Sequence, residues 1–164
     1  MGYNLMIGEF KVDSDPEYRW ARATAEVHSV EGHGNSVWNP SYSGWHNAMR
    51  SLGLIDPFFG DDDDRHALWT APGGEEFDPL LRFHPGAVAL TESHARVFEA
   101  ARDAWKERGT DFWEVSDYRN GQPVWKCKPC TPEVRATLLE VAEWLAFWSR
   151  WALDNCKHPT FANS

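Results

Sequence analysis

Cysteine, positive charge and long apolar runs are all scarce in this chain of 164 residues. Its three cysteines, an odd number without a hydrophobic segment at the start, indicate a reducing intracellular environment and exclude a disulfide scaffold. The chain has 16 Lys and Arg and 25 Asp and Glu residues, and the resulting net charge of −9 argues against direct binding to a nucleic-acid backbone. The most apolar stretch, Val141 to Leu153, is shorter than the roughly 20 apolar residues that cross a bilayer. We therefore expect a soluble, cytoplasmic protein without a membrane partner.

Recognisable catalytic motifs are also missing. The chain has no P-loop, nucleophile elbow, His-Glu-x-x-His motif or dinucleotide-binding glycine pattern. His158-Pro159-Thr160 matches half of a paired phosphoesterase pattern, and there is no second copy. The run Asp61 to Asp64 lacks the spacing of an EF-hand loop and is typical of a solvated acidic loop. We expect no cofactor, and catalysis is less well supported than binding.

Cys127 and Cys130 have the spacing of zinc ligands or a thiol redox pair, and Cys156 with His158 could complete a set of four ligands. If residues 131–155 form one helix, its ends lie about 36 Å apart, because an α-helix rises about 1.5 Å per residue. Zinc ligands all lie about 2 Å from the ion. We therefore expect no metal site and interpret the thiols as packing residues.

Apolar and aromatic residues are plentiful, at 42% and 14% of the chain, and ten residues are tryptophan. This composition excludes intrinsic disorder. A chain of this length can bury about 70% of its surface on folding, which is enough for a core without disulfides. Each indole adds a large apolar area and an N–H group that needs an acceptor when it is buried. We expect one globular domain, residues 1–164, with a core rich in tryptophan.

Alternation of apolar and polar residues predicts two antiparallel hairpins. One covers residues 3–27, on either side of a turn at Asp13 to Pro16. The other covers residues 112–126, where Asn120-Gly121 is a strong signal for a two-residue hairpin turn. The segment 31–36 contains two glycines and no apolar period, and we expect it to be a loop.

Three segments combine an N-terminal capping residue with apolar residues at helical spacing. They run from Ser41 or Ser43 to Gly53, from Thr91 to Arg108, and from Thr131 to about Asn155. The last is apolar nearly all round, which predicts burial. Residues 55–86 show little periodicity and should form a long irregular excursion. The prediction is an α+β fold with two small antiparallel hairpins and two shorter helices packed around a long, Trp-rich, buried C-terminal helix.

A ligand site is predicted where aromatic and donor side chains surround the helix that begins near Ser41. The candidate ligand-binding residues are Trp38, Tyr42, Trp45, His46, Arg50 and His84. Trp20, Trp69 and Trp113 lie near polar, turn or glycine-bearing segments and are further candidates for ring stacking. The simpler interpretation is that Trp45 is a core residue and that the histidines are surface or capping residues.

Short segments spread over most of the chain carry a resemblance to known proteins. They are Met1-Gly2-Tyr3, Ile7-Gly8-Glu9, Gly53-Leu54, Phe58-Phe59-Gly60, His84-Pro85-Gly86 and the ending from Trp151 to Ser164. In order and spacing they resemble a set of small bacteriophage and prophage proteins of unassigned function. The resemblance implies an accessory protein made inside an infected bacterial cell, and it assigns no catalytic or binding residue.

Three functional hypotheses follow. The first is a non-catalytic phage-type accessory protein, with anti-defence as one role, that binds a small polar or nucleotide-like ligand in an aromatic-walled pocket. The second is an acidic inhibitor that mimics nucleic acid and binds a basic surface of a host protein, in a complex that weakens with ionic strength. The third is a small hydrolase that uses His and Asp residues of the irregular segment, such as His66 and His84.

Overall fold

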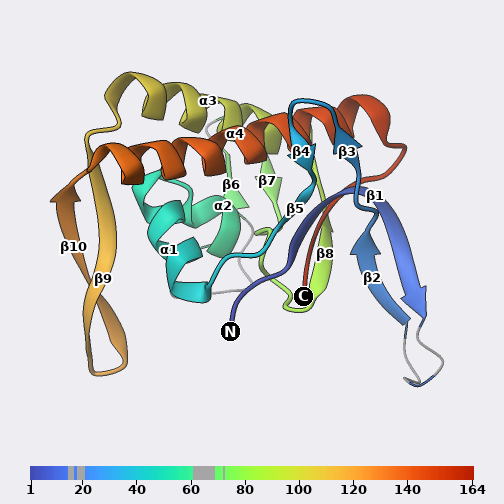
Figure 1. The fold of residues 1–164 in the computed structure, drawn as a ribbon. Helices are drawn as coiled ribbons and strands as arrows, with labels where there is room; N and C mark the ends of the chain where they lie inside the picture. The colour runs from blue at the N-terminus through green and yellow to red at the C-terminus, as the bar shows by residue number, and fades with distance from the viewer. Residues whose placement is uncertain (15–16, 18–20, 61–68, 72) are drawn as a thin grey trace.

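A computed structural model describes residues 1–14, 17, 21–60, 69–71 and 73–164 of the chain (Figure 1). Within these residues the fold is α+β, with four helices and several antiparallel sheets. The helices are α1 (Tyr42–Ser51), α2 (Ile55–Phe59), α3 (Glu92–Arg108) and α4 (Pro132–Asn155). The strands are β1 (Leu5–Ser14), β2 (Ala21–Ala25), β3 (Ser29–Val30), β4 (Gly34–Asn35), β5 (Val37–Trp38), β6 (Trp69–Thr70), β7 (Glu76–Phe77), β8 (Gly86–Ala89), β9 (Asp111–Arg119), β10 (Gln122–Pro129) and β11 (Pro159–Asn163).

The main sheet has the order β2-β1-β11-β8, and β5 also pairs with β1. The pairing of β1 with β2, from Phe10 opposite Ala25 to Ser14 opposite Ala21, confirms the N-terminal hairpin. The turn predicted at Asp13 to Pro16 begins later than expected, because Asp13 and Ser14 are still paired within β1. The first half of β1 pairs with β11, which the sequence did not predict. Four of the five residues of β11 are buried, so the strand shows no alternation of apolar and polar residues from which it could be recognised.

The three predicted helices are confirmed together with their caps. The side chains of Ser41, Thr91 and Thr131 accept hydrogen bonds from backbone N–H groups in the first turns of α1, α3 and α4. The predicted loop at residues 31–36 is corrected in part, because β3 and β4 pair across a tight turn. The β9–β10 hairpin is confirmed, with positive φ at Asn120 and Gly121, as its turn requires.

Helix α4 lies beside α3 (Figure 1) and also contacts α1, β1 and β11. It is buried along its middle, whereas Pro132 and Glu133 at its start and Asp154 and Asn155 at its end are exposed. Its 24 residues are continuous and separate Cys130 from Cys156 by about 36 Å, at about 1.5 Å per residue. No helix within the described residues is long and apolar enough to cross a membrane.

The core is built around Phe58 of α2, which is fully buried. Its ring centroid lies 5.3 Å from that of Trp45, 5.6 Å from that of Phe98 and 5.5 Å from that of Phe161. These rings belong to α1, α3 and β11, so one aromatic cluster joins elements that are far apart in the sequence. Trp148 of α4 is also fully buried, in agreement with the expected tryptophan-rich core.

The predicted irregular segment, residues 55–86, contains α2 and the short strand pair β6–β7. Trp69 of this pair lies over the buried His94 ring, with the two centroids 6.2 Å apart. The acidic run Asp61 to Asp64 and His66 lie outside the described residues, as does Trp20.

Candidate functional site

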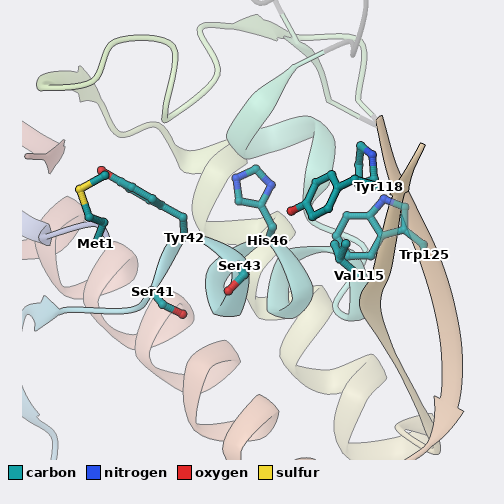
Figure 2. Close-up of a pocket in the computed structure, with 9 residues that line it drawn as sticks. Met1, Ser41, Tyr42, Ser43, His46, Val115, Tyr118 and Trp125 are labelled. Atoms are coloured by element: carbon teal, nitrogen blue, oxygen red, sulfur yellow. The ribbon is translucent and has the colours of Figure 1, made fainter. Parts of the chain in front are cut away.

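Helix α1 and the β9–β10 hairpin enclose a cavity of about 440 Å³, which we call the tyrosine–histidine cavity. Helix α1 contributes Tyr42, Ser43 and His46 to its wall. The hairpin contributes Tyr118 and Trp125. Figure 2 shows His46 between Tyr42 on one side and the two hairpin residues on the other, with the Tyr118 hydroxyl directed toward it. Residues about 80 positions apart in the sequence therefore meet at one site, at the first turns of a helix.

The ring of His46 is held on two sides. It stacks on Phe59, with ring centroids 4.2 Å apart. Its Nε2 atom lies 3.4 Å from the hydroxyl of Tyr3, in a contact between hydrogen-bonding groups. Tyr3 also packs edge-on against Tyr42, at 4.6 Å between centroids. Tyr3, in the chain segment before β1, thus contacts two of the α1 residues in the cavity wall, Tyr42 and His46.

His84 reaches this site through Tyr42, whose hydroxyl lies 3.3 Å from His84 Nε2. The other ring nitrogen, Nδ1, lies 2.5 Å from Oδ1 of Asn163 in β11. The Asn163 side chain is only 2% exposed, while His84 is exposed. A buried amide therefore orients a surface imidazole toward Tyr42.

Arg50 of α1 contacts two indole rings of the hairpin. Its guanidinium lies 5.3 Å from the ring centroid of Trp113 and 5.0 Å from that of Trp125, in the range of cation–π contacts. Two hydrogen bonds act beside it: Ser51 Oγ accepts from the Trp113 N–H at 2.8 Å, and Asn47 Oδ1 accepts from the Val115 N–H at 3.2 Å. The structure thus places Arg50 where it holds the hairpin against α1.

Trp38 and Trp45 lie in the wall of a second cavity, of about 510 Å³, between α1, β9 and the first turns of α4. Trp45 is only 1% exposed and belongs to the core, as the simpler interpretation predicts. Trp38 is half-buried against Trp144, at 5.8 Å between ring centroids. The six predicted site residues are therefore divided between two cavities and their surroundings. Tyr42 and His46 line the first cavity, and Trp38 and Trp45 line the second. His84 and Arg50 line neither of these two cavities; they contact Tyr42 and the hairpin, respectively.

Sequence reasoning missed five residues of the site: Tyr3, Ser43, Tyr118, Trp125 and Asn163. Tyr118 carries a weak signal in the sequence, because it is a large aromatic residue two positions before the Asn-Gly turn of the predicted hairpin. Tyr3 and Asn163 carry none, because their roles arise from contacts with residues 43 and 80 positions away.

The chemistry of the tyrosine–histidine cavity is that of stacking and neutral hydrogen bonding. The described residues that line it include no Asp, Glu, Lys, Arg or Cys. They offer hydroxyls, one imidazole and aromatic faces, together with the apolar side chains of Met1, Val115 and Pro123. Among the residues that the structure describes, no three His, Cys, Asp or Glu side chains gather as metal ligands.

Comparison with protein-family models, curated proteins and solved structures finds no match to this chain.

Proposed function

We propose that the protein binds, without catalysis, a small polar molecule that has a flat heteroaromatic ring, with a nucleoside as the model ligand. The observation that carries the proposal is the tyrosine–histidine cavity, with His46 on one side and Tyr118 and Trp125 on the other. Its volume of about 440 Å³ lies within the range of about 300 to 1,000 Å³ typical of small-molecule sites.

Stacking would supply most of the affinity. Aromatic side chains bind the faces of bases and sugars, and each stacked base contributes about 1–3 kcal/mol in single-stranded nucleic-acid complexes. Tyr118 is 64% exposed, so its ring is available to a ligand. The His46 imidazole and the Ser43 hydroxyl can bind the polar edge of the ring. The Tyr42 hydroxyl, which points away from the hairpin and toward Met1, can bind a group of the ligand at the other end of the cavity.

The absence of Lys and Arg from the described lining favours a nucleoside over a ligand with several phosphates. The net charge of −9 also disfavours a ligand with several phosphates, because like charges repel. A phage accessory role, in which the protein sequesters or senses such a molecule in the infected cell, is supported by the sequence resemblance alone.

The test is a thermal-shift screen of the four common nucleosides and their mono- and triphosphates, followed by calorimetry of any hit. A ligand that binds only the native state at 100 times its Kd adds about 2.7 kcal/mol to the free energy of unfolding and raises Tm. We expect a nucleoside to raise Tm.

The decisive variant is Tyr118→Ala, which should weaken binding about tenfold because one stacking contact of about 1–3 kcal/mol is lost. Phe10→Ala is the matched control, since Phe10 is an exposed aromatic residue of β1 outside the cavity. The proposal is wrong if no nucleoside or nucleotide shifts Tm, or if the two variants bind a hit equally well.

A further inference from the structure

The neighbours of Asn163 permit only one orientation of its side-chain amide. Its Nδ2 donates to the backbone carbonyl of Phe83 at 2.8 Å, and its Oδ1 lies 2.5 Å from His84 Nδ1. The reversed amide would place two oxygen atoms, both acceptors, at the Phe83 contact, which is unfavourable. Asn163 Oδ1 therefore faces His84 as an acceptor.

This orientation determines where the proton of neutral His84 resides. An acceptor at Nδ1 requires a proton on that nitrogen, so the neutral imidazole has its lone pair on Nε2. The Tyr42 hydroxyl, 3.3 Å from Nε2, then donates to His84. The only hydroxyl proton of Tyr42 is used in this hydrogen bond. The Tyr42 oxygen can therefore only accept a hydrogen bond from a further partner.

We infer that Asn163 and His84 make Tyr42 an obligate acceptor in the tyrosine–histidine cavity, so that the site selects amino-bearing over oxo-bearing heteroaromatic rings. This inference rests on the proposed function and narrows its ligand class. An exocyclic amine can donate to Tyr42, whereas an oxo group in the same place would put two acceptors together. His84 and Asn163 are positioning residues here, because they act through Tyr42.

Two matched pairs of nucleosides test the selectivity: adenosine against inosine, and cytidine against uridine. Calorimetry at pH 8 should give a preference for the amino member of at least one pair of roughly threefold to tenfold, the net worth of one hydrogen bond. Equal affinity for both members of each pair, or a preference for the oxo members, would overturn the selectivity.

Two variants identify the cause. Tyr42→Phe removes the acceptor and should bring the ratio of the affinities for the amino and oxo members close to one. His84→Ala releases the Tyr42 proton for the ligand and should lower or reverse the preference. His158→Ala is the control for the second variant, because His158 is another exposed histidine, whose Nδ1 donates to the Glu9 carboxylate outside the cavity. A preference unchanged in Tyr42→Phe overturns the inference.

A measurement without ligand separates this inference from the proposed function. Nitrogen-15 NMR of the histidine side chains at pH 8 should show His84 protonated at Nδ1, and a proton at Nε2 would overturn the inference whatever binds. If no nucleoside binds the wild-type protein, the proposed function fails and the selectivity fails with it. If nucleosides bind without preference, only the selectivity fails.

Discussion

His94, in the first turn of α3, is fully buried, and this burial lowers the pKa of its imidazole to about 4. The rings of Phe77 and Phe98 pack around it, with centroids 4.7 and 6.4 Å away. Its Nδ1 accepts a hydrogen bond from the Thr91 N–H at 3.1 Å and completes the capping box of α3. One side chain thus caps a helix and fills the core, and it does so in the neutral form.

This burial predicts a pH dependence of stability. The unfolded chain binds the His94 proton below about pH 6.5, whereas the native protein binds it only below about pH 4. Between these values the unfolded state holds more protons, so the free energy of unfolding falls as the pH drops from 6.5 toward 4. Above pH 6.5 the full free energy of unfolding is present. Below about pH 4 the loss from His94 reaches about 3 kcal/mol, because each unit of difference between the two pKa values is worth about 1.36 kcal/mol.

The measurement is chemical denaturation at a series of pH values from 4 to 7.5. His94→Gln keeps a residue that suits the capping box and cannot titrate, so its stability should fall less steeply with decreasing pH. His33→Gln, at an exposed histidine, should retain the wild-type slope. Identical slopes in wild type and His94→Gln would contradict the assignment.

Among the elements, the β9–β10 hairpin depends most on a few contacts. It packs mainly on α1, through Arg50 between two indoles and through two hydrogen bonds at Asn47 and Ser51. The same hairpin supplies Tyr118 and Trp125 to the candidate site. The geometry of the cavity is therefore set by how firmly the hairpin is held against α1.

Arg50→Ala should loosen this hairpin and leave the α3–α4 pair intact. Two cation–π contacts of about 0.5–1 kcal/mol each are lost, so amide protection in residues 111–129 should fall about fivefold to thirtyfold. Hydrogen exchange read by mass spectrometry measures this change against residues 132–155. Arg108→Ala serves as the control, since that side chain is 81% exposed. Equal protection of the hairpin in both variants would show that Arg50 does not hold it.

At the scale of the whole molecule, strand β11 brings the last residues of the chain back against the first ones. This strand lies between β1 and β8, and its Phe161 is fully buried against Phe58. It also carries Asn163 into the candidate site. Stability and the positioning of His84 therefore depend on the same short strand.

Phe161→Ala should lower the free energy of unfolding by about 3–5 kcal/mol, because it removes a large ring from the packed core and leaves a cavity. Urea denaturation measures the loss. Phe10→Ala, at a ring that is 44% exposed, should change it by no more than about 0.5 kcal/mol. A loss below 1 kcal/mol for Phe161→Ala would mean that β11 does not organise the core as described.

The sequence by itself determined the features that depend on neighbouring residues. The caps at Ser41, Thr91 and Thr131, and the turn at Asn120-Gly121, predicted three helices and one hairpin to within a few residues. These signals are local, because a cap or a turn acts over three or four positions. Aromatic content likewise predicted a core rich in tryptophan.

Only the tertiary structure decided the order of the sheet and the composition of the candidate site. Strand β11 carries no periodic signal, and its place between β1 and β8 arises from pairing with residues far along the chain. The sequence predicted Tyr42 and His84 individually, but the contact between them, and the hydrogen bond to Asn163 that orients His84, depend on folding that joins three distant segments. The physical reason is that a helix forms from local contacts, whereas a binding site needs side chains that only packing brings within a few ångströms of one another.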